Sequence, residues 1–172
     1  MEKSALQIAR AAYQPKLPAG LRGNVKIVEG APTQSVDNQE EIKALFPNTY
    51  GMPLVNFEPT DEKKEYAPIN IGIILSGGQA PGGHNVICGL YDGLKKQNPN
   101  SKLYGFLMGP GGLVDHNYIE MTDALIDEYR NTGGFDMIGS GRTKLEEVAQ
   151  FEKGMEVIRQ LGLNAIVIIG GD

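Results

Sequence analysis

A short glycine-rich segment of this sequence has the residue types that bind an anion through the protein backbone. Residues 76–83 read SGGQAPGG, with four glycines in eight positions, between an apolar run and a helical pattern. Glycine adopts positive φ readily and lets a ligand approach the backbone N–H groups, and the start of the following helix adds a partial positive charge. We therefore predict that Gly77, Gly78 and Gly82 bind a phosphate group. The alternative is a tight turn between a strand and a helix, without a ligand.

The same segment lacks the two most common nucleotide-binding fingerprints. A Walker loop needs Lys and then Ser or Thr after its last glycine, but Gly83 is followed by His84 and Asn85. A dinucleotide-binding loop needs Gly-x-Gly-x-x-Gly, which residues 77–82 do not provide. A dinucleotide-dependent oxidoreductase is therefore disfavoured, and we expect a phosphate site of a less general kind.

A second glycine segment and the final residues add charged side chains. Residues 139–144 read GSGRTK, where Arg142 can bind a phosphate through two N–H groups and Lys144 adds a point charge. Asp172 follows the last apolar run, and a carboxylate in that place can hold Mg²⁺ beside phosphates. The alternatives are two solvated cations at a helix start for the first pair, and a helix N-cap for Asp172.

Apolar runs alternate with helical patterns in the second part of the chain. We expect strands at residues 69–75, 103–107, 136–138 and 165–169, and helices at residues 84–97, 122–129 and 144–161. This alternation predicts an α/β fold, a parallel sheet with helices on both faces. Ligands bind at the carboxyl ends of the strands in such sheets, so the glycine segments at 76–83, 109–112 and 139–144 should lie on one rim.

Two of these helices are expected to bury an apolar face. The face of the first helix contains Val86, Ile87, Leu90 and Leu94, and that of the last contains Val148, Phe151, Met155 and Ile158. Cys88, beside the first of these faces, is predicted to be a small buried residue.

The first 68 residues differ from the rest, because prolines recur there and divide the chain into short pieces. Helices are expected at residues 4–13 and 37–46, the second with Asp37 as N-cap and Glu40 in the position of a capping box. We predict an irregular extension at residues 1–68 that wraps around an α/β domain at residues 69–172.

Composition and charge limit the class of protein. The 172 residues are 41% hydrophobic and 22% charged, which is ordinary for a soluble globular domain. The net charge of -5 argues against nucleic acid and against an anionic membrane as partners. Cys88 is the single cysteine, so no internal disulfide can form. Because the chain has no signal-like start and no apolar run of about 20 residues, we expect a cytoplasmic protein.

Four segments, in order, resemble the phosphofructokinase family. They are IGIILSGGQAPGGHNVI at 71–87, GFLMGPGGL at 105–113, GGFDMIGSGRTK at 133–144 and AIVIIGGD at 165–172. The N-terminal part, including PNTYGMP, is similar to the long, plant-like branch of the family that uses pyrophosphate. ATP-dependent members usually carry Asp where this chain has Gln79, and a shorter Met-Asn ending where it has Gly83, His84 and Asn85. The resemblance therefore favours the pyrophosphate-dependent branch.

The resemblance implies a glycolytic enzyme that transfers phosphate from pyrophosphate to fructose 6-phosphate, reversibly and with Mg²⁺, to give fructose 1,6-bisphosphate. By motif, Gly78 would contact the donor phosphates, Arg142 would bind the donor and stabilise charge during transfer, and Asp172 would bind Mg²⁺. In the family, the residue that helps to select the donor, the catalytic base and most sugar-phosphate contacts lie beyond Asp172. We therefore expect an N-terminal piece, inactive alone, of a protein that forms a homo-oligomer.

Two other functions stay open from the sequence. One is an ATP-dependent 6-phosphofructokinase, which the residue after Asp172 in a longer chain would distinguish. The other is a non-catalytic module that senses phosphate or supports assembly.

Overall fold

The chain divides into two compact units. The computed structural model describes residues 3–18, 20 and 22–170. One unit contains residues 14–64, and the other contains residues 1–13 together with residues 65–172. The predicted wrapping of a core by residues 1–68 stays a prediction.

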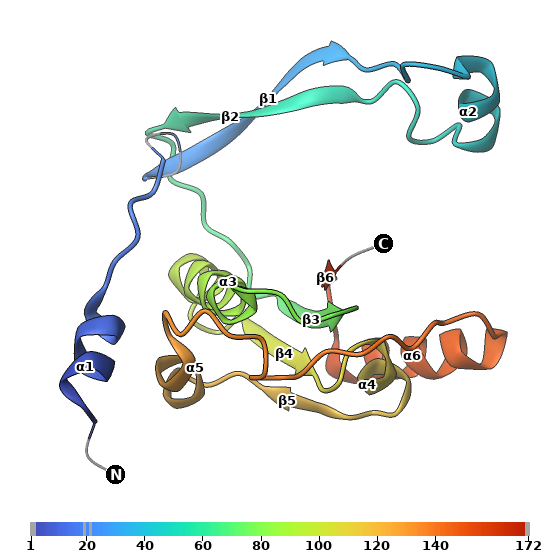
Figure 1. Ribbon diagram of the computed structural model, residues 1–172. Coiled ribbons are helices and arrows are strands. Elements are labelled where there is room, and N and C mark those ends of the chain that lie inside the picture. Colours follow the sequence, from blue (N-terminus) through green and yellow to red (C-terminus); the bar gives the residue numbers. More distant parts are fainter. Residues whose placement is uncertain (1–2, 19, 21, 171–172) are drawn as a thin grey trace. The chain divides into compact units, whose positions relative to one another are not determined.

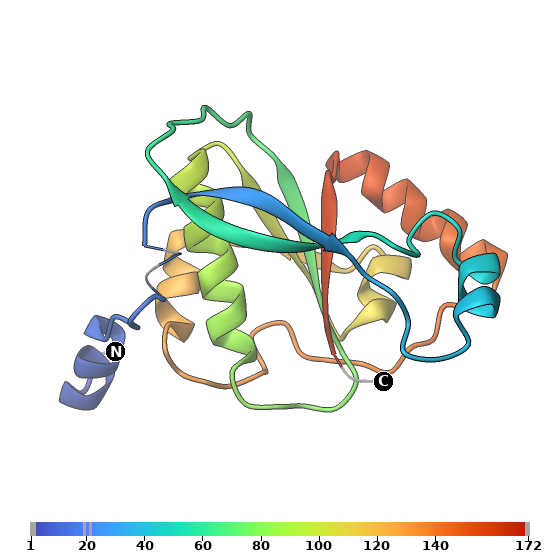
Figure 2. The same ribbon diagram turned by 90° about the horizontal axis from the view of Figure 1, so that it is seen from above.

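A four-stranded sheet forms the centre of the larger unit, with the strand order β5-β4-β3-β6 (Figures 1 and 2). Its strands are β3 (Asn70–Ser76), β4 (Lys102–Phe106), β5 (Tyr118–Glu120) and β6 (Ala165–Gly170). The central strand β3 is parallel to β4 and to β6, as the sequence predicts. The short β5 was not predicted, and it pairs antiparallel with β4 at the edge of the sheet.

Helices cover both faces of this sheet, which confirms the predicted α/β class. Figure 2 shows α3 (Gly83–Gln97) and α5 (Asp123–Tyr129) on one side, and α4 (Pro110–Val114) and α6 (Val148–Leu161) on the other. Alternate residues of β3 serve the two faces. Ile73 and Leu75 pack in the cluster that contains Ile87 of α3, whereas Ile74 packs in the cluster that contains Val157 of α6. No helix in the described part of the chain is long and apolar enough to cross a membrane.

The buried face of α3 differs in part from the prediction. Ile87 and Leu94 are buried and Leu90 is partly buried, but Val86 is 46% exposed. Tyr91 and Cys88 are buried in its place, which confirms the interior position predicted for the cysteine. Burial raises the pKa of the Cys88 thiol, so this residue is a packing group rather than a reactive one.

The prediction for α6 is wrong for three of its four apolar residues. Val148, Phe151 and Met155 are 72%, 50% and 44% exposed, and only Ile158 packs in part against the core. The buried side of the helix is instead the side of Gly154 and Val157. The helix also begins at Val148 rather than at residue 144, because the Gln150 side chain accepts hydrogen bonds from the backbone of Glu146 and Glu147.

The last strand, β6, pairs only with β3 among the described strands, so its other edge is open. Its residues are partly buried or exposed, and Ile168 is 66% exposed. The strand predicted at residues 165–169 is confirmed, but it is less buried than its apolar sequence suggests, because nothing in the described chain covers this edge.

No strand forms at residues 136–138, which is a further correction. Met137 and Ile138 are buried, but the backbone N–H of Met137 donates to the ring of His84 instead of to a neighbouring strand. The segment meets the sheet only further on, through an isolated parallel bridge between Gly141 and Ser76. Buried apolar residues therefore occur here in an irregular segment that side chains hold in place.

The smaller unit is an antiparallel pair of strands, β1 (Asn24–Pro32) and β2 (Pro53–Thr60), with the helix α2 (Gln39–Leu45) between them in sequence. Neither strand was predicted, because the recurring prolines predict short, irregular pieces in this part of the chain. Both strands lie at a sheet edge, where a residue without an N–H group is tolerated.

The helix α2 confirms the predicted helix but not its cap. Asn38, with φ of 51°, is the N-cap, and its side chain makes no capping hydrogen bond. The Asp37 carboxylate accepts from the N–H of Asn38, so it does not reach the helix and the predicted capping box is absent.

Two glycines test the packing of the larger unit. Gly89 lies on the exposed side of α3 with open space around it, so Gly89→Ala should raise the free energy of unfolding by about 0.5–1 kcal/mol. Gly105 lies against Met121 and Ile138, so Gly105→Ala should lower it by about 1–3 kcal/mol. Urea unfolding followed by circular dichroism measures both. Equal effects of the two substitutions would contradict this packing.

Candidate phosphate-binding site

Glycine segments from distant parts of the sequence meet at the carboxyl end of β3. Ser76, the last residue of β3, pairs with Gly170 of β6 in the sheet register and forms a bridge with Gly141. The backbone N–H of Gly77 then donates to the carbonyl of Gly141, at 2.9 Å. The predicted gathering of glycine segments on one rim of the sheet is confirmed here.

The segment around Gly141 also crosses the chain that leaves β4. A Cβ on Gly141 would collide with the carbonyl of Met108, and a Cβ on Gly109 would collide with the backbone of Gly141. The N–H of Met108 donates to the carbonyl of Ile138 at 2.8 Å, which holds the two segments together. Glycine is required at this crossing because backbone contacts backbone.

The glycines at residues 109–112 serve packing rather than an open loop. Pro110 begins the short helix α4, and Gly109 precedes it with φ of 82°. A Cβ on Gly112 would collide with the backbone of Leu107. These glycines therefore let the chain fold back tightly beneath the site.

The start of α3 is less free for a ligand than the sequence suggests. Gly82 is the N-cap of this helix, with φ of 97°, and its N–H donates to the carbonyl of Gly133 at 2.8 Å. The N–H of His84 donates to the carbonyl of Gly134 at 2.9 Å. Two N–H donors near the start of α3 thus bind carbonyls within the protein. The residues before Gly82 therefore carry more of any anion binding than the N-terminus of the helix does.

The N–H groups of Gly78, Gln79 and Ala80, in the loop before Gly82, are further donors. No described residue accepts a hydrogen bond from any of the three. A hollow of about 450 Å³ opens beside them, lined by Gly78, Ala80, Pro81, Gly82, Gly83, Val86, Phe135, Ile169 and Gly170. Unused backbone donors beside a hollow are the physical requirement for binding an anion without a nucleotide fingerprint.

The guanidinium of Arg142 lies against the same loop. Its Nη2 atom is 3.3 Å from the place that a Cβ would occupy on Gly78, so a side chain there would displace it. The side chain of Arg142 is exposed, and none of the ion pairs within the described residues involves it. An uncommitted cation beside uncommitted N–H groups favours a bound anion.

No contact among the described residues joins Lys144 to this group. Lys144 is exposed and lies in the irregular segment before α6, where its carbonyl accepts from the Gln150 side chain at 3.3 Å. No contact brings its ammonium group to the glycine loop within the described residues. Its predicted role in phosphate binding therefore rests on the sequence alone.

The predicted metal ligand, Asp172, lies outside the described residues. Within the described part of the chain, no group of three His, Cys, Asp or Glu side chains could hold a metal ion. Magnesium is bound next to phosphates by few protein ligands, so such a group is not required for it. The Mg²⁺ site stays a prediction.

His84 and Phe135 are the residues whose part in the site the sequence analysis missed. His84 is buried at the start of α3 and contacts the segment that leads to Arg142 through both ring nitrogens. Phe135 packs its ring over Gly83 and lines the hollow. The sequence feature that indicates this contact is the pair Gly133-Gly134. A Cβ on Gly134 would lie 2.6 Å from the ring of His84, so glycine is needed there.

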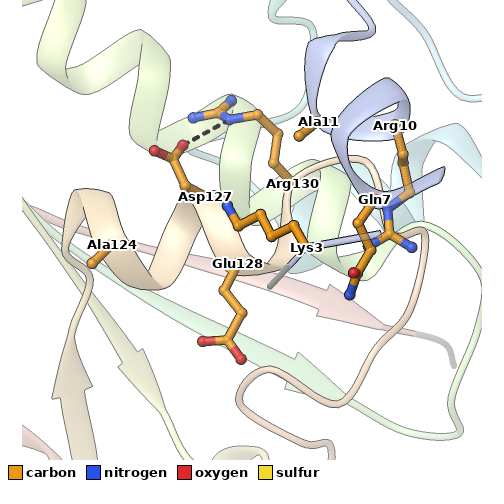
Figure 3. Close-up of a pocket in the computed structure, with 8 residues that line it drawn as sticks. All are labelled: Lys3, Gln7, Arg10, Ala11, Ala124, Asp127, Glu128 and Arg130. Atoms are coloured by element: carbon orange, nitrogen blue, oxygen red, sulfur yellow. Dashed lines mark hydrogen bonds and ion pairs between the residues drawn. The ribbon is translucent and has the colours of Figure 1, made fainter. Parts of the chain in front are cut away.

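A larger hollow, of about 680 Å³, lies elsewhere in the same unit. Figure 3 shows it between α1 (Ala5–Ala12), which contributes Gln7, Arg10 and Ala11, and the residues of and after α5. The guanidinium of Arg130, which lines this hollow, is already neutralised. It binds Asp92 through two nitrogens and Asp127 through a third. We assign the phosphate site to the smaller hollow, which has the free backbone donors.

The Phosphofructokinase family matches residues 70–172 of this chain. The "Pyrophosphate--fructose 6-phosphate 1-phosphotransferase" of Porphyromonas gingivalis is 63% identical over the whole chain, and the protein of the same name from Entamoeba histolytica is 49% identical. A subunit beta 2 of that name from Arabidopsis thaliana is 43% identical over 98% of the chain. The chain spans about a third of the length of these curated relatives: 31%, 32% and 30%.

Solved structures agree with the fold. A pyrophosphate-dependent phosphofructokinase from Nitrosospira multiformis matches 61% of this chain and 27% of its own, with a TM-score of 0.53 and 24% identity. One from Marinobacter aquaeolei matches 60% of this chain and 26% of its own, with a TM-score of 0.51 and 24% identity. At this level of identity the likeness supports the fold alone.

Arg142 and Lys144 provide a matched test of the site, because both are exposed cations close in sequence and only Arg142 contacts the glycine loop. Arg142→Ala should weaken the binding of inorganic pyrophosphate about tenfold or more, as expected for a lost charged hydrogen bond. Lys144→Ala should change the affinity by less than about threefold. Isothermal calorimetry at constant ionic strength measures both, and equal losses would contradict the assigned geometry.

Proposed function

We propose, because the chain belongs to the phosphofructokinase family, that it carries the donor-phosphate site of a phosphotransferase that uses pyrophosphate. The acceptor is fructose 6-phosphate, the sugar named in the relatives that match the whole chain. One observation carries the proposal: N–H groups after Gly77 that have no acceptor among the described residues lie beside the guanidinium of Arg142, which makes no ion pair with them, at the carboxyl end of β3.

In the proposed reaction, the sugar hydroxyl oxygen forms a bond to one phosphorus of pyrophosphate. The bond from that phosphorus to the bridging oxygen breaks, and inorganic phosphate leaves. The hydroxyl proton goes to a base that we do not place among the described residues. The products are fructose 1,6-bisphosphate and phosphate, and the proposed reaction is reversible.

This chain contributes binding and charge neutralisation to that reaction. The N–H groups of Gly78, Gln79 and Ala80 would hold the oxygens of the donor, and Arg142 would stabilise the negative charge that grows on the leaving phosphate. Phosphoryl transfer depends mainly on such positioning and electrostatic stabilisation, since the protein forms no covalent intermediate. Gly78 is suited to this place because it leaves room for the guanidinium.

Two further components belong to the same proposal. Mg²⁺, bound through Asp172 and the donor phosphates, would neutralise part of the phosphate charge. The exposed apolar side chains on α6 and the open edge of β6 would be covered by further chain in a protein of the relatives' length, or by a second subunit. A cytoplasmic location also stays a prediction.

The choice of donor can be tested directly on this chain. With Mg²⁺ present, pyrophosphate should bind about tenfold or more tightly than ATP, because the relatives above are named for pyrophosphate. Competition calorimetry measures this, with inorganic phosphate as the control for a single anion. Tighter binding of ATP would instead assign the ATP-dependent activity. Binding of neither, in a sample with a dispersed amide spectrum, would contradict a donor site in this chain.

A further inference from the structure

His84 occupies an unusual position that the proposed function does not use. It is the second residue of α3, directly after the glycine loop, and only 2% of its side chain is exposed. Its ring packs edge-to-face against Tyr129, with the ring centres 4.8 Å apart. A histidine so deeply buried must satisfy both ring nitrogens within the protein.

The hydrogen bonds define where the proton on this ring lies. The hydroxyl of Thr132 donates to the carbonyl of Tyr129 at 2.6 Å, so toward the 2.6 Å contact with His84 Nδ1 it can only accept. Nδ1 therefore carries a hydrogen. Nε2 accepts the backbone N–H of Met137 at 2.9 Å, so it carries none. The ring is neutral, with its proton on Nδ1.

Asp136 introduces a second, incompatible partner for Nε2. Its Oδ1 atom lies 3.0 Å from Nε2, and a carboxylate can bind that nitrogen only when the nitrogen is protonated. Burial lowers the pKa of His84 and keeps it neutral, while the charge of Asp136 opposes this. The aspartate side chain is 77% exposed, so water stabilises the carboxylate while the ring is neutral.

The other groups around the ring carry no charge. From α5 comes the ring of Tyr129, and from the segment after α5 comes the hydroxyl of Thr132. On α3 itself, Asn85 is neutral and binds the N–H of Gly133, and the thiol of Cys88 points to the carbonyl of Ile126. In the described part of the chain, Asp136 is the only carboxylate within 4 Å of the ring.

The ring is connected to both parts of the phosphate site through one continuous segment. Residues 132–142 bind the ring at Thr132 and Met137, and they bind the glycine loop through Gly141, whose carbonyl accepts from Gly77. Arg142 follows next in sequence. A change at the amide of Met137 therefore acts on the segment that positions the guanidinium opposite Gly78.

We propose that His84 is a positioning residue for the phosphate site, and that it works as a switch between two partners of Nε2. In the neutral ring, Nε2 binds the Met137 amide and residues 132–142 hold Arg142 in place. In the protonated ring, Nε2 binds Asp136 instead, the amide of Met137 loses its acceptor, and the affinity for the diphosphate falls. The ligand in this inference rests on the proposed function, whereas the two states of the ring do not.

The substitution Asp136→Asn provides a sharp test, because it removes the negative charge that stabilises the protonated ring and changes an exposed residue. Since Asp136 raises the pKa of His84, the variant should have a lower His84 pKa and should keep its affinity for pyrophosphate to lower pH. The ratio of the two proteins' affinities, measured by calorimetry from pH 8 to pH 5.5, cancels the protonation of the ligand itself. The variant should gain about threefold or more over the original chain at the acid end.

Nitrogen NMR of the histidine ring, recorded without ligand, tests the two states separately from the function. At pH 8 the shifts should show a hydrogen on Nδ1, and the titration midpoint should move to lower pH in Asp136→Asn. A hydrogen on Nε2 at pH 8, or identical midpoints, would overturn the inference. If pyrophosphate fails to bind at any pH, the proposed function is wrong. The inference then stands if the amide shifts of Met137 and Arg142 change as His84 is protonated, and it is overturned if they do not.

His84→Gln distinguishes a positioning role from simple packing. Glutamine can accept from the Met137 amide but does not titrate in this pH range. A positioning role predicts that His84→Gln keeps its affinity for pyrophosphate at pH 8. It also predicts that adding Asp136→Asn to His84→Gln does not change the pH dependence of that affinity. If this variant binds with the same pH dependence as the original chain, the switch is excluded.

Discussion

Backbone contacts backbone where residues 139–142 cross the carboxyl end of β3, and the rest of the site depends on that crossing. The carbonyl of Gly141 accepts from Gly77, its N–H donates to Leu75 at 3.4 Å, and its Cα lies against Met108 and Gly109. Only glycine allows such an approach. The crossing holds together three segments that are far apart in sequence. It also places Arg142 beside the loop after β3.

Some backbone N–H groups near the site bind carbonyls within the protein, and only the others are available to a ligand. The N–H groups of Gly77, Gly82 and His84 bind carbonyls of residues 133–141, so they act as structural ties. The N–H groups of Gly78, Gln79 and Ala80 are left between these ties. A few backbone donors and one guanidinium lie beside a hollow whose lining is otherwise mostly apolar, and these polar groups suit the oxygens of a diphosphate.

The sequence predicted the parts of the fold that depend on local patterns. The strands β3, β4 and β6, the helices α3, α5 and α6, both helix-covered faces and the meeting of the glycine segments follow from periodicity and from glycine chemistry. The predictions failed where tertiary contacts decide. Residues 136–138 look like a strand, but the ring of His84 takes the amide of Met137. Phe151 lies on an amphipathic helix, but no described element covers it, and sequence periodicity cannot show whether a partner is present.

Amide chemical-shift mapping with inorganic pyrophosphate tests the central claim most directly. The account predicts that the largest shifts occur at the N–H groups of Gly78, Gln79 and Ala80, because no described residue accepts a hydrogen bond from them before binding. The amides of Gly77 and Gly82, which bind carbonyls already, should shift less. The largest shifts around Arg10 in the hollow beside α5, with none after β3, would contradict the assignment of the phosphate site.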